Sequence, residues 1–171
     1  FRIACELEYK PFDRAILTRF ASLIRKGGAV LDLGCGPGHV SRFLADQGIA
    51  ITGVDLSGCM IDEARRFHPD LSFTQGSMLE LEFIGEIAGI VAFYSIIHIP
   101  RNQQVVMFAN WHNALEPGGF LLLSFHIGEA DRHLDELWGE PVSLDFLFFG
   151  REEIERRLQE AGFVILESHE R

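Results

Sequence analysis

The sequence contains few cysteines, and they are spread widely along the chain. Cys5, Cys35 and Cys59 are the three cysteines in 171 residues. An odd number at such wide spacing excludes a disulfide framework and a paired zinc motif. The sequence therefore predicts no metal site, and it favours a reducing, cytoplasmic setting.

Clusters of basic residues and long apolar runs are also missing. Lysine and arginine number 15 against 25 aspartate and glutamate residues, which gives a formal net charge of −10. Because binding to a phosphate backbone depends on clustered lysine and arginine, a nucleic-acid partner is not expected. No apolar run reaches the roughly 20 residues that a membrane-spanning helix needs, so no association with a membrane is expected.

A single domain covering residues 1–171 is the expectation for a chain of this length. The share of hydrophobic residues, 47%, is that of an ordinary globular protein. No basic-then-apolar leader opens the chain, and its first residue is Phe1 rather than a methionine. Some N-terminal sequence is therefore expected to be absent.

Apolar residues follow two spacings that alternate along the chain. Stretches with helical spacing are followed by short apolar runs of strand length. The expected helices cover residues 12–25, 39–47, 58–67, 102–115 and 151–162, and the expected strands cover 29–33, 50–55, 71–75, 87–95, 120–127 and 163–169. Strands and helices in this alternation predict an α/β fold whose mostly parallel sheet is covered by helices on both faces.

A glycine-rich turn separates the first expected strand from the helix after it, in "AVLDLGCGPGHV" at residues 29–40. In an open parallel sheet, ligands bind beyond the carboxyl ends of the strands, where this turn is expected to lie. Gly34 and Gly36 have no side chain, so a ligand can approach the main-chain amides closely. Asp55 ends the second strand, 21 residues after Gly34, and a carboxylate there can accept both hydroxyls of a ribose. The pattern indicates an adenosine-containing ligand.

The spacing of the glycines discriminates between such ligands. The dinucleotide fingerprint is G-x-G-x-x-G, whereas Gly34, Gly36 and Gly38 are spaced one residue shorter. The segments "VLDLGCGPGHV", "GVDLS", "QGSMLEL", "IVAFYSIIHI" and "LEPGGFLLLSF", in this order, make the chain similar to the class I S-adenosylmethionine-dependent methyltransferases from about residue 9 to its end. The resemblance implies S-adenosyl-L-methionine as the cofactor and a three-layer Rossmann-like methyltransferase fold.

The resemblance also implies a last, antiparallel strand after the sixth. The chain stops at Arg171 before such a strand can form. We therefore expect this strand to be missing and the chain to be trimmed at both ends.

The family assigns roles to residues around the glycine turn. The turn, Gly34 to Gly38, packs against the methionine portion of the cofactor, and Asp55 binds the ribose. Leu56 is implied to lie against the adenine. Asp32 either supports the turn or contacts the cofactor's ammonium group through it. Cys35 is counted with the turn, although a small buried apolar role is the favoured interpretation of its thiol.

Residues after the third and fourth strands complete the implied cofactor site. Ser77 and Met78 would bracket the adenine ring. Many family members carry an aspartate where Ser77 stands, and a serine hydroxyl accepts a weaker, neutral hydrogen bond. Tyr94 and Ser95 would border the amino-acid end of the cofactor and its reactive methyl group.

Two histidines are the candidate catalytic bases. Methyl transfer to a neutral oxygen or a protonated nitrogen requires a base near the acceptor. His98 lies just beyond the fourth expected strand and His126 lies at the carboxyl end of the fifth, so both are expected to face the crevice. For each of them a hydrogen-bonded structural role or a solvated position is the alternative.

The expected function is methyl transfer to a small-molecule acceptor. Residues 143–150, "SLDFLFFG", either wall an apolar acceptor pocket or form a core strand. A non-catalytic protein that binds S-adenosylmethionine and a methyltransferase with a macromolecular acceptor remain as alternatives. The short glycine spacing contradicts a nicotinamide-dependent oxidoreductase, and "FYSIIHIP" in place of an Asn-Pro-Pro-Tyr motif disfavours DNA adenine methylation.

Overall fold

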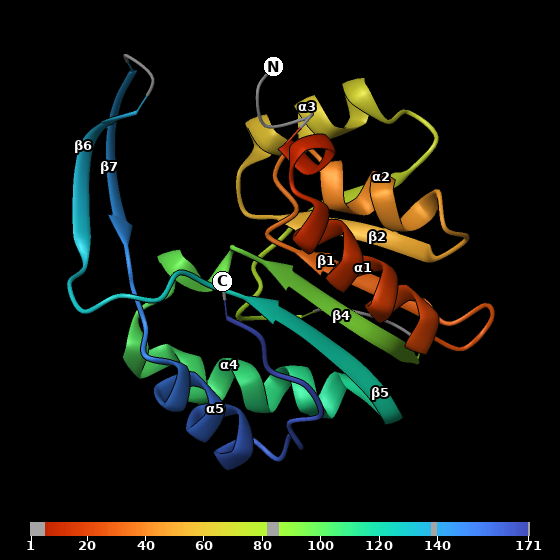
Figure 1. The fold of residues 1–171 in the computed structure, drawn as a ribbon. Helices are drawn as coiled ribbons and strands as arrows, with labels where there is room; N and C mark the ends of the chain where they lie inside the picture. The colour runs from red at the N-terminus through yellow and green to blue at the C-terminus, as the bar shows by residue number, and fades with distance from the viewer. Residues whose placement is uncertain (1–5, 82–85, 138–139, 171) are drawn as a thin grey trace.

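A five-stranded parallel sheet forms the centre of the molecule (Figure 1). The computed structural model describes residues 6–81, 86–137 and 140–170. The strand order is β3-β2-β1-β4-β5, with β1 at Ala29–Leu33, β2 at Ala50–Asp55, β3 at Ser72–Gln75, β4 at Ile87–Phe93 and β5 at Leu115–Ser124. The order reverses between β1 and β4, so the carboxyl ends of these two strands border the crevice where such sheets bind ligands.

Helices cover both faces of the sheet, as the alternation of patterns predicted. Helices α1, α2 and α3 lie on one face, and α4 and α5 lie on the other (Figure 1). Their bounds are α1 at Pro11–Leu23, α2 at His39–Ala45, α3 at Gly58–Phe67, α4 at Arg101–Ala114 and α5 at Arg151–Glu160, with short 3-10 helices η1 at Glu6–Tyr9 and η2 at Ile96–His98. The predicted three-layer α/β fold is confirmed.

Strands buried on both faces explain the continuous apolar runs of the sequence. Side chains alternate along a strand, so Val30 packs with the α1 and α2 layer while Leu31 and Leu33 pack with the α4 and α5 layer. The larger core cluster centres on Phe108 and Trp111 of α4, both fully buried. Such burial on both sides is typical of parallel sheets.

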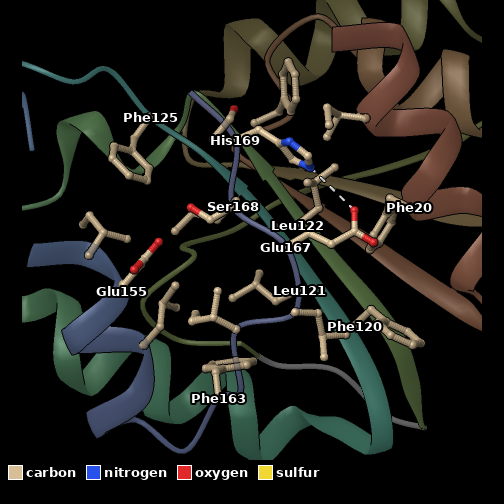
Figure 2. Close-up of a pocket in the computed structure, with 18 of the residues that line it drawn as sticks. Phe20, Phe120, Leu121, Leu122, Phe125, Glu155, Phe163, Glu167, Ser168 and His169 are labelled. Atoms are coloured by element: carbon tan, nitrogen blue, oxygen red, sulfur yellow. Dashed lines mark ion pairs between the residues drawn. The ribbon is translucent and has the colours of Figure 1, made fainter. Parts of the chain in front are cut away.

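Residues 163–169, at the end of the chain, do not have the structure expected from the sequence. Residues 163–169 form no strand, so the predicted sixth strand is wrong. A cavity of about 1130 Å³ separates this segment from β5, and Figure 2 shows Leu121 and Leu122 of β5 facing Phe163 and Glu167 across it. A strand is stable only when its backbone groups pair with a neighbour, and none of the described strands pairs with this segment. Arg19 of α1 instead holds it through an ion pair with Glu167 at 2.8 Å.

Two further segments were predicted incompletely. Helix α4 ends at Ala114, as the "EPGG" stop implied, but β5 already begins at Leu115, before the expected start at residue 120. Residues 143–146 belong to β7 (Glu140–Phe146), which pairs antiparallel with β6 (Arg132–Leu137) in a separate hairpin. The hairpin stands apart from the central sheet (Figure 1), so this segment is not a core strand of that sheet.

Features that bear on the cell compartment are few. Within the described ranges, none of the helices has the length and apolar character needed to cross a bilayer. Cys35 is buried and Cys59 is exposed, and both are free thiols. Cys5 lies outside the described residues.

The buried face of β4 provides a test of the core. Ile90 is fully buried in the cluster beneath α4 and α5, so Ile90→Ala is expected to lower the free energy of unfolding by about 2–5 kcal/mol. Val106 of α4 is 64% exposed, and Val106→Ala should change it by only about 0.5 kcal/mol or less. Urea denaturation followed by circular dichroism measures both, and equal losses would contradict this assignment of the core.

Candidate functional site

The glycine turn sits at the carboxyl end of β1 and is tied to β2. The amides of Gly34 and Cys35 donate hydrogen bonds to the carbonyl of Val54, at 2.8 and 3.1 Å. Gly34 has a φ of +74°, and a Cβ atom built there would lie 2.4 Å from the Cβ of Ser95. Both the backbone conformation and the close approach therefore require glycine at this position.

Asp55 is held at the mouth of the turn by two backbone amides. Its Oδ2 accepts a hydrogen bond from the amide of Gly36 at 2.8 Å, and its Oδ1 accepts one from the amide of Ser57 at 2.9 Å. These bonds orient the carboxylate at the end of β2, and each oxygen keeps a further lone pair for a ligand. A Cβ atom at Gly36 would meet nothing within 4 Å, so open space lies beside the oriented carboxylate.

Ser95 faces the turn from the end of β4. Its hydroxyl oxygen is buried and has no hydrogen-bond partner among the residues that the structure describes. Buried hydroxyl groups are normally paired, because leaving one unpaired costs free energy. Within the described part of the chain, the Ser95 Oγ beside Gly34 is therefore a hydrogen-bonding group whose capacity is unused.

Asp32 lies beneath the turn and not in its mouth. It is almost completely buried, and its Oδ2 accepts a hydrogen bond from the hydroxyl of Ser41 in α2 at 2.7 Å. Burial raises the pKa of Asp32 to about 7. The contact with Ser41 fastens β1 to α2 and thereby supports the turn. Cys35 is buried as well, and its burial raises the pKa of the thiol, so it is not a reactive nucleophile.

The residues expected to surround an adenine ring follow the carboxyl ends of the neighbouring strands β2 and β3. Leu56 directly follows Asp55 and is 73% exposed, which is unusual for a large apolar side chain. The Ser77 hydroxyl oxygen accepts a hydrogen bond from the amide of Leu79 at 3.2 Å. The carbonyl of Met78 accepts one from the indole of Trp111 at 2.8 Å, which anchors this loop to α4.

Tyr94 has a backbone conformation that non-glycine residues rarely adopt. Its φ is +54°, which costs about 1–3 kcal/mol unless the surroundings hold it in place. Its amide donates hydrogen bonds to the carbonyl and the hydroxyl of Ser124, at 3.1 and 2.9 Å. The Tyr94 ring stacks on His126, with ring centroids 4.8 Å apart. The strained turn thus brings the ends of β4 and β5 together.

His98 has a defined hydrogen-bonding partner. Its Nδ1 lies 2.8 Å from the carbonyl oxygen of Asp145. A carbonyl only accepts, so Nδ1 carries the proton of the neutral ring and Nε2 carries the lone pair. The ring also contacts Phe146 edge to face, with centroids 4.8 Å apart. His98 is exposed, borders the hairpin and lines neither cavity.

A second cavity, of about 340 Å³, lies between the end of β5 and the hairpin. It is lined by His126, Arg132, Leu134, Phe146 and Phe148. The sequence segment 143–150 was expected to wall an acceptor pocket or form a core strand. Phe146 and Phe148 do line this cavity, whereas Phe149 is fully buried in the core. Arg132 and Leu134 were not anticipated, since they lie in no motif and only strand alternation could have placed them on one face.

Comparisons with known proteins agree with this geometry. A sequence profile of the family described as "Methyltransferase domain" matches residues 30–119. This range runs from β1 into β5 and contains the glycine turn, Asp55 and Ser95. The chain is also 31% identical over 126 residues to YqeM of Bacillus subtilis (strain 168), which is named as a methyltransferase, and the match covers 70% of this chain and 51% of YqeM.

Two further relatives are informative. N-demethylindolmycin N-methyltransferase of Streptomyces griseus is 34% identical over 98 residues, which cover 54% of this chain and 41% of that protein. The chain thus spans about half the length of YqeM and less of this enzyme. The crystal structure of an S-adenosylmethionine-dependent methyltransferase from Clostridium acetobutylicum ATCC 824 superposes with a TM-score of 0.71 at 19% identity, covering 97% of this chain and 87% of that chain. This likeness shows the fold.

The buried Asp32 leads to a prediction about pH. Its pKa in the folded protein is about 7, above the ordinary value of 3.8, so folding favours the protonated form. Its contribution to stability is therefore complete below about pH 4 and is lost as the pH rises through about 7. Relative to Asp32→Asn, the free energy of unfolding of the wild type should fall over this window, by at most about 1.4 kcal/mol per pH unit.

Urea denaturation at several pH values tests this expectation. Asp62 of α3 is exposed, so Asp62→Asn should follow the wild-type pH dependence. Parallel curves for the wild type and Asp32→Asn would show that Asp32 does not titrate in this window.

Proposed function

Because the chain belongs to the methyltransferase domain family, we propose that it transfers a methyl group from S-adenosyl-L-methionine to an oxygen or nitrogen of a small-molecule acceptor. The observation that carries the proposal is the pairing of the glycine turn with the oriented Asp55 carboxylate. Gly36 donates to that carboxylate at 2.8 Å and leaves open space beside it.

The residues at this end of the sheet fit the cofactor. Asp55 would accept the ribose hydroxyls, and the exposed Leu56 would cover the adenine. Ser77 and Met78 would lie on the other side of the ring. The unpaired Ser95 hydroxyl beside Gly34 supports a polar contact at the methionine end. The short spacing Gly34, Gly36, Gly38 supports this ligand over a dinucleotide.

The protein's part in the reaction is positioning and exclusion of water. When bound, S-adenosylmethionine supplies a methyl group on a positively charged sulfonium, which makes in-line displacement by an acceptor favourable. Tyr94 and Ser95, held by the bond from the Tyr94 amide to Ser124, would border this group. Holding two reactants in line and out of water supplies most of the acceleration such a step needs.

We assign the role of base to His98. An acceptor hydroxyl loses its proton as the new bond forms, whereas an ammonium must lose a proton beforehand to free the lone pair that attacks the methyl group. The Asp145 carbonyl fixes the His98 proton on Nδ1, which leaves Nε2 able to take that proton. His126 lines the cavity of about 340 Å³ directly, so we propose that it contacts the acceptor and serves as the second candidate.

The comparisons support an acceptor of small size. One relative is named for methyl transfer to a nitrogen of demethylindolmycin, which is a small molecule, and a cavity of about 340 Å³ is near the lower limit of ordinary ligand pockets. We further propose that the chain forms one domain and acts in the cytoplasm. The free thiols of Cys35 and Cys59 support a reducing compartment.

Calorimetric titration tests the cofactor. S-adenosylmethionine and S-adenosylhomocysteine are expected to bind to the wild type, and NAD is expected not to bind. Asp55→Ala removes charge-assisted hydrogen bonds worth about 1.5–3 kcal/mol, so it should weaken binding of the first two at least about tenfold. Asp62→Ala, at an exposed site on α3, serves as the control and should bind like the wild type. Binding of NAD alone would overturn the proposal.

Turnover tests the assignment of the base. With an acceptor identified by screening, His98→Gln is expected to lower kcat about 10²- to 10⁴-fold, while the Kd for S-adenosylhomocysteine stays unchanged. His112 of α4 contacts Phe163 on the far side of the sheet, so His112→Gln is the matched control. An unchanged kcat in His98→Gln, with a loss in His126→Gln, would move the role to His126. Cofactor binding without turnover of any acceptor would favour a non-catalytic binding protein.

A further inference from the structure

The second cavity carries one arginine beside a histidine and apolar and aromatic side chains. Arg132 lines it together with His126, Leu134, Phe146 and Phe148. The guanidinium lies over the Phe148 ring, with its Cζ 5.5 Å from the ring centroid. Among the described residues, Arg132 forms no ion pair with a carboxylate. Arg132 is thus an unpaired cation in a protein of net charge −10.

The hairpin directs Arg132 toward the cavity and places Asp135 and Asp145 beside His133, on its other face. Arg132 pairs directly with Phe146 across the hairpin, and directly paired residues lie on the same face. The adjacent pair, His133 and Asp145, occupies the opposite face and is joined by a hydrogen bond of 2.7 Å. Asp135 contacts the same histidine at 3.2 Å. These two carboxylates are therefore engaged by His133 and not by Arg132.

Asp131, which precedes Arg132, is also neutralised. Arg101 donates to both of its carboxylate oxygens, at 2.6 and 3.0 Å, and to the carbonyl of Phe148 at 2.7 Å. Asp131 in turn accepts a hydrogen bond from the amide of Phe148 at 3.1 Å. This clamp holds the Phe148 backbone, so the aromatic wall beneath Arg132 is fixed before a ligand arrives.

The aromatic wall continues toward the glycine turn. The ring centroids of Phe148 and His126 lie 5.8 Å apart, and the His126 ring stacks on the Tyr94 ring with centroids 4.8 Å apart. Tyr94 is the neighbour in sequence of Ser95, which faces Gly34. A flat molecule lying along these rings would extend from Arg132 toward the cofactor end of the sheet.

We propose that this cavity binds a planar aromatic acceptor that carries a carboxylate, with Arg132 as the specificity-determining residue. The planar fork of a guanidinium matches a carboxylate, and a ring lying on another ring is favoured by contact and by electrostatics. The inference rests on the proposed function, because the rings lead to the cofactor end. It adds the chemical class of the acceptor.

Fluorine NMR titration with a matched pair of probes tests the carboxylate. 4-Fluorobenzoate and 4-fluorobenzamide have the same shape and differ in charge. We expect 4-fluorobenzoate to bind to the wild type about tenfold more tightly, and we expect Arg132→Gln to abolish this preference while changing the amide's affinity less than about twofold. Equal binding of the two probes by the wild type would overturn the proposal, and so would a preference that survives in Arg132→Gln.

Arg14 provides the matched control. It is an exposed arginine of α1 whose Cζ lies 5.3 Å from the centroid of the Phe43 ring, and it does not line the cavity. Arg14→Gln should keep the full preference for 4-fluorobenzoate. Loss of the preference in this variant as well would show that it arises from overall charge, which contradicts a specific site.

A third probe tests the planar ring. Cyclohexanecarboxylate has the charge without a flat face, and it should bind more weakly than 4-fluorobenzoate in a competition titration. Equal affinity would overturn the aromatic part of the proposal.

The titrations are made with and without S-adenosylhomocysteine, which separates the two proposals. Binding of S-adenosylhomocysteine without a preference for the carboxylate probe would leave the proposed function standing and refute the acceptor class. A carboxylate preference that depends on Arg132, in a protein that binds no S-adenosylhomocysteine, would support the anion site and refute the proposed function.

Discussion

The close approach of the Gly34 backbone to Ser95 is the constraint on which the candidate site depends. Parallel pairing of β1 with both β2 and β4 brings three carboxyl ends to one edge of the sheet. A turn with any side chain at Gly34 would collide with the β4 connection. Because Gly34 has no side chain, the turn can pass close to Ser95. The amide of Gly36 then lies within hydrogen-bond distance of Asp55 at the end of β2. The arrangement of the turn, Asp55 and Ser95 is thus a consequence of strand order combined with one missing Cβ atom.

A second set of contacts extends this edge outward. The unusual backbone of Tyr94 is held by Ser124, and the rings of Tyr94, His126 and Phe148 follow one another from β4 to the hairpin. Arg101 fixes the far end by binding Asp131 and the Phe148 carbonyl. The proposed cofactor site therefore rests on the sheet, whereas the cavity proposed for the acceptor rests on the hairpin and on the contacts of Arg101. Proteins of one family can share the site at the end of the sheet and differ in the cavity beside the hairpin, because a fold does not determine the substrate.

The sequence was sufficient wherever a local physical requirement determined the structure. The glycine-rich stretch predicted the turn at Gly34, where the structure has a backbone conformation that favours glycine. The continuous apolar run predicted β4, which the structure buries on both faces. The cap of α3 is equally local, since the hydroxyl of Ser57 accepts a hydrogen bond from the amide of Met60 at 3.4 Å. Each of these features is encoded within a few neighbouring residues.

The sequence-based predictions failed where contacts with residues far away in the sequence determine the structure. Residues 163–169 are as apolar as a strand, but a strand also needs a neighbour to pair with, and periodicity carries no information about that neighbour. Arg132 was missed for a related reason. The candidate role of Arg132 depends on its contact with the ring of Phe148, 16 residues away in sequence. It also depends on the pairing of nearby carboxylates with His133 and Arg101. No spacing rule detects an arginine whose acidic neighbours are already engaged.

The position of β5 at the end of the strand order has a consequence for how the molecule behaves among its own copies. Within residues 115–124, the described ladder of β5 runs to β4 alone, so its other edge presents a row of backbone donors and acceptors beside leucine side chains. Another extended chain can pair with such an edge through backbone hydrogen bonds. Natural proteins usually prevent this by placing charged residues on the edge or by covering it. Here Glu167 and His169 stand across the cavity as the polar side chains of the covering segment (Figure 2). The tendency to pair with another chain and the chemistry of the site therefore belong to different parts of one sheet, the first to its edge strand β5 and the second to the turn after its middle strand β1.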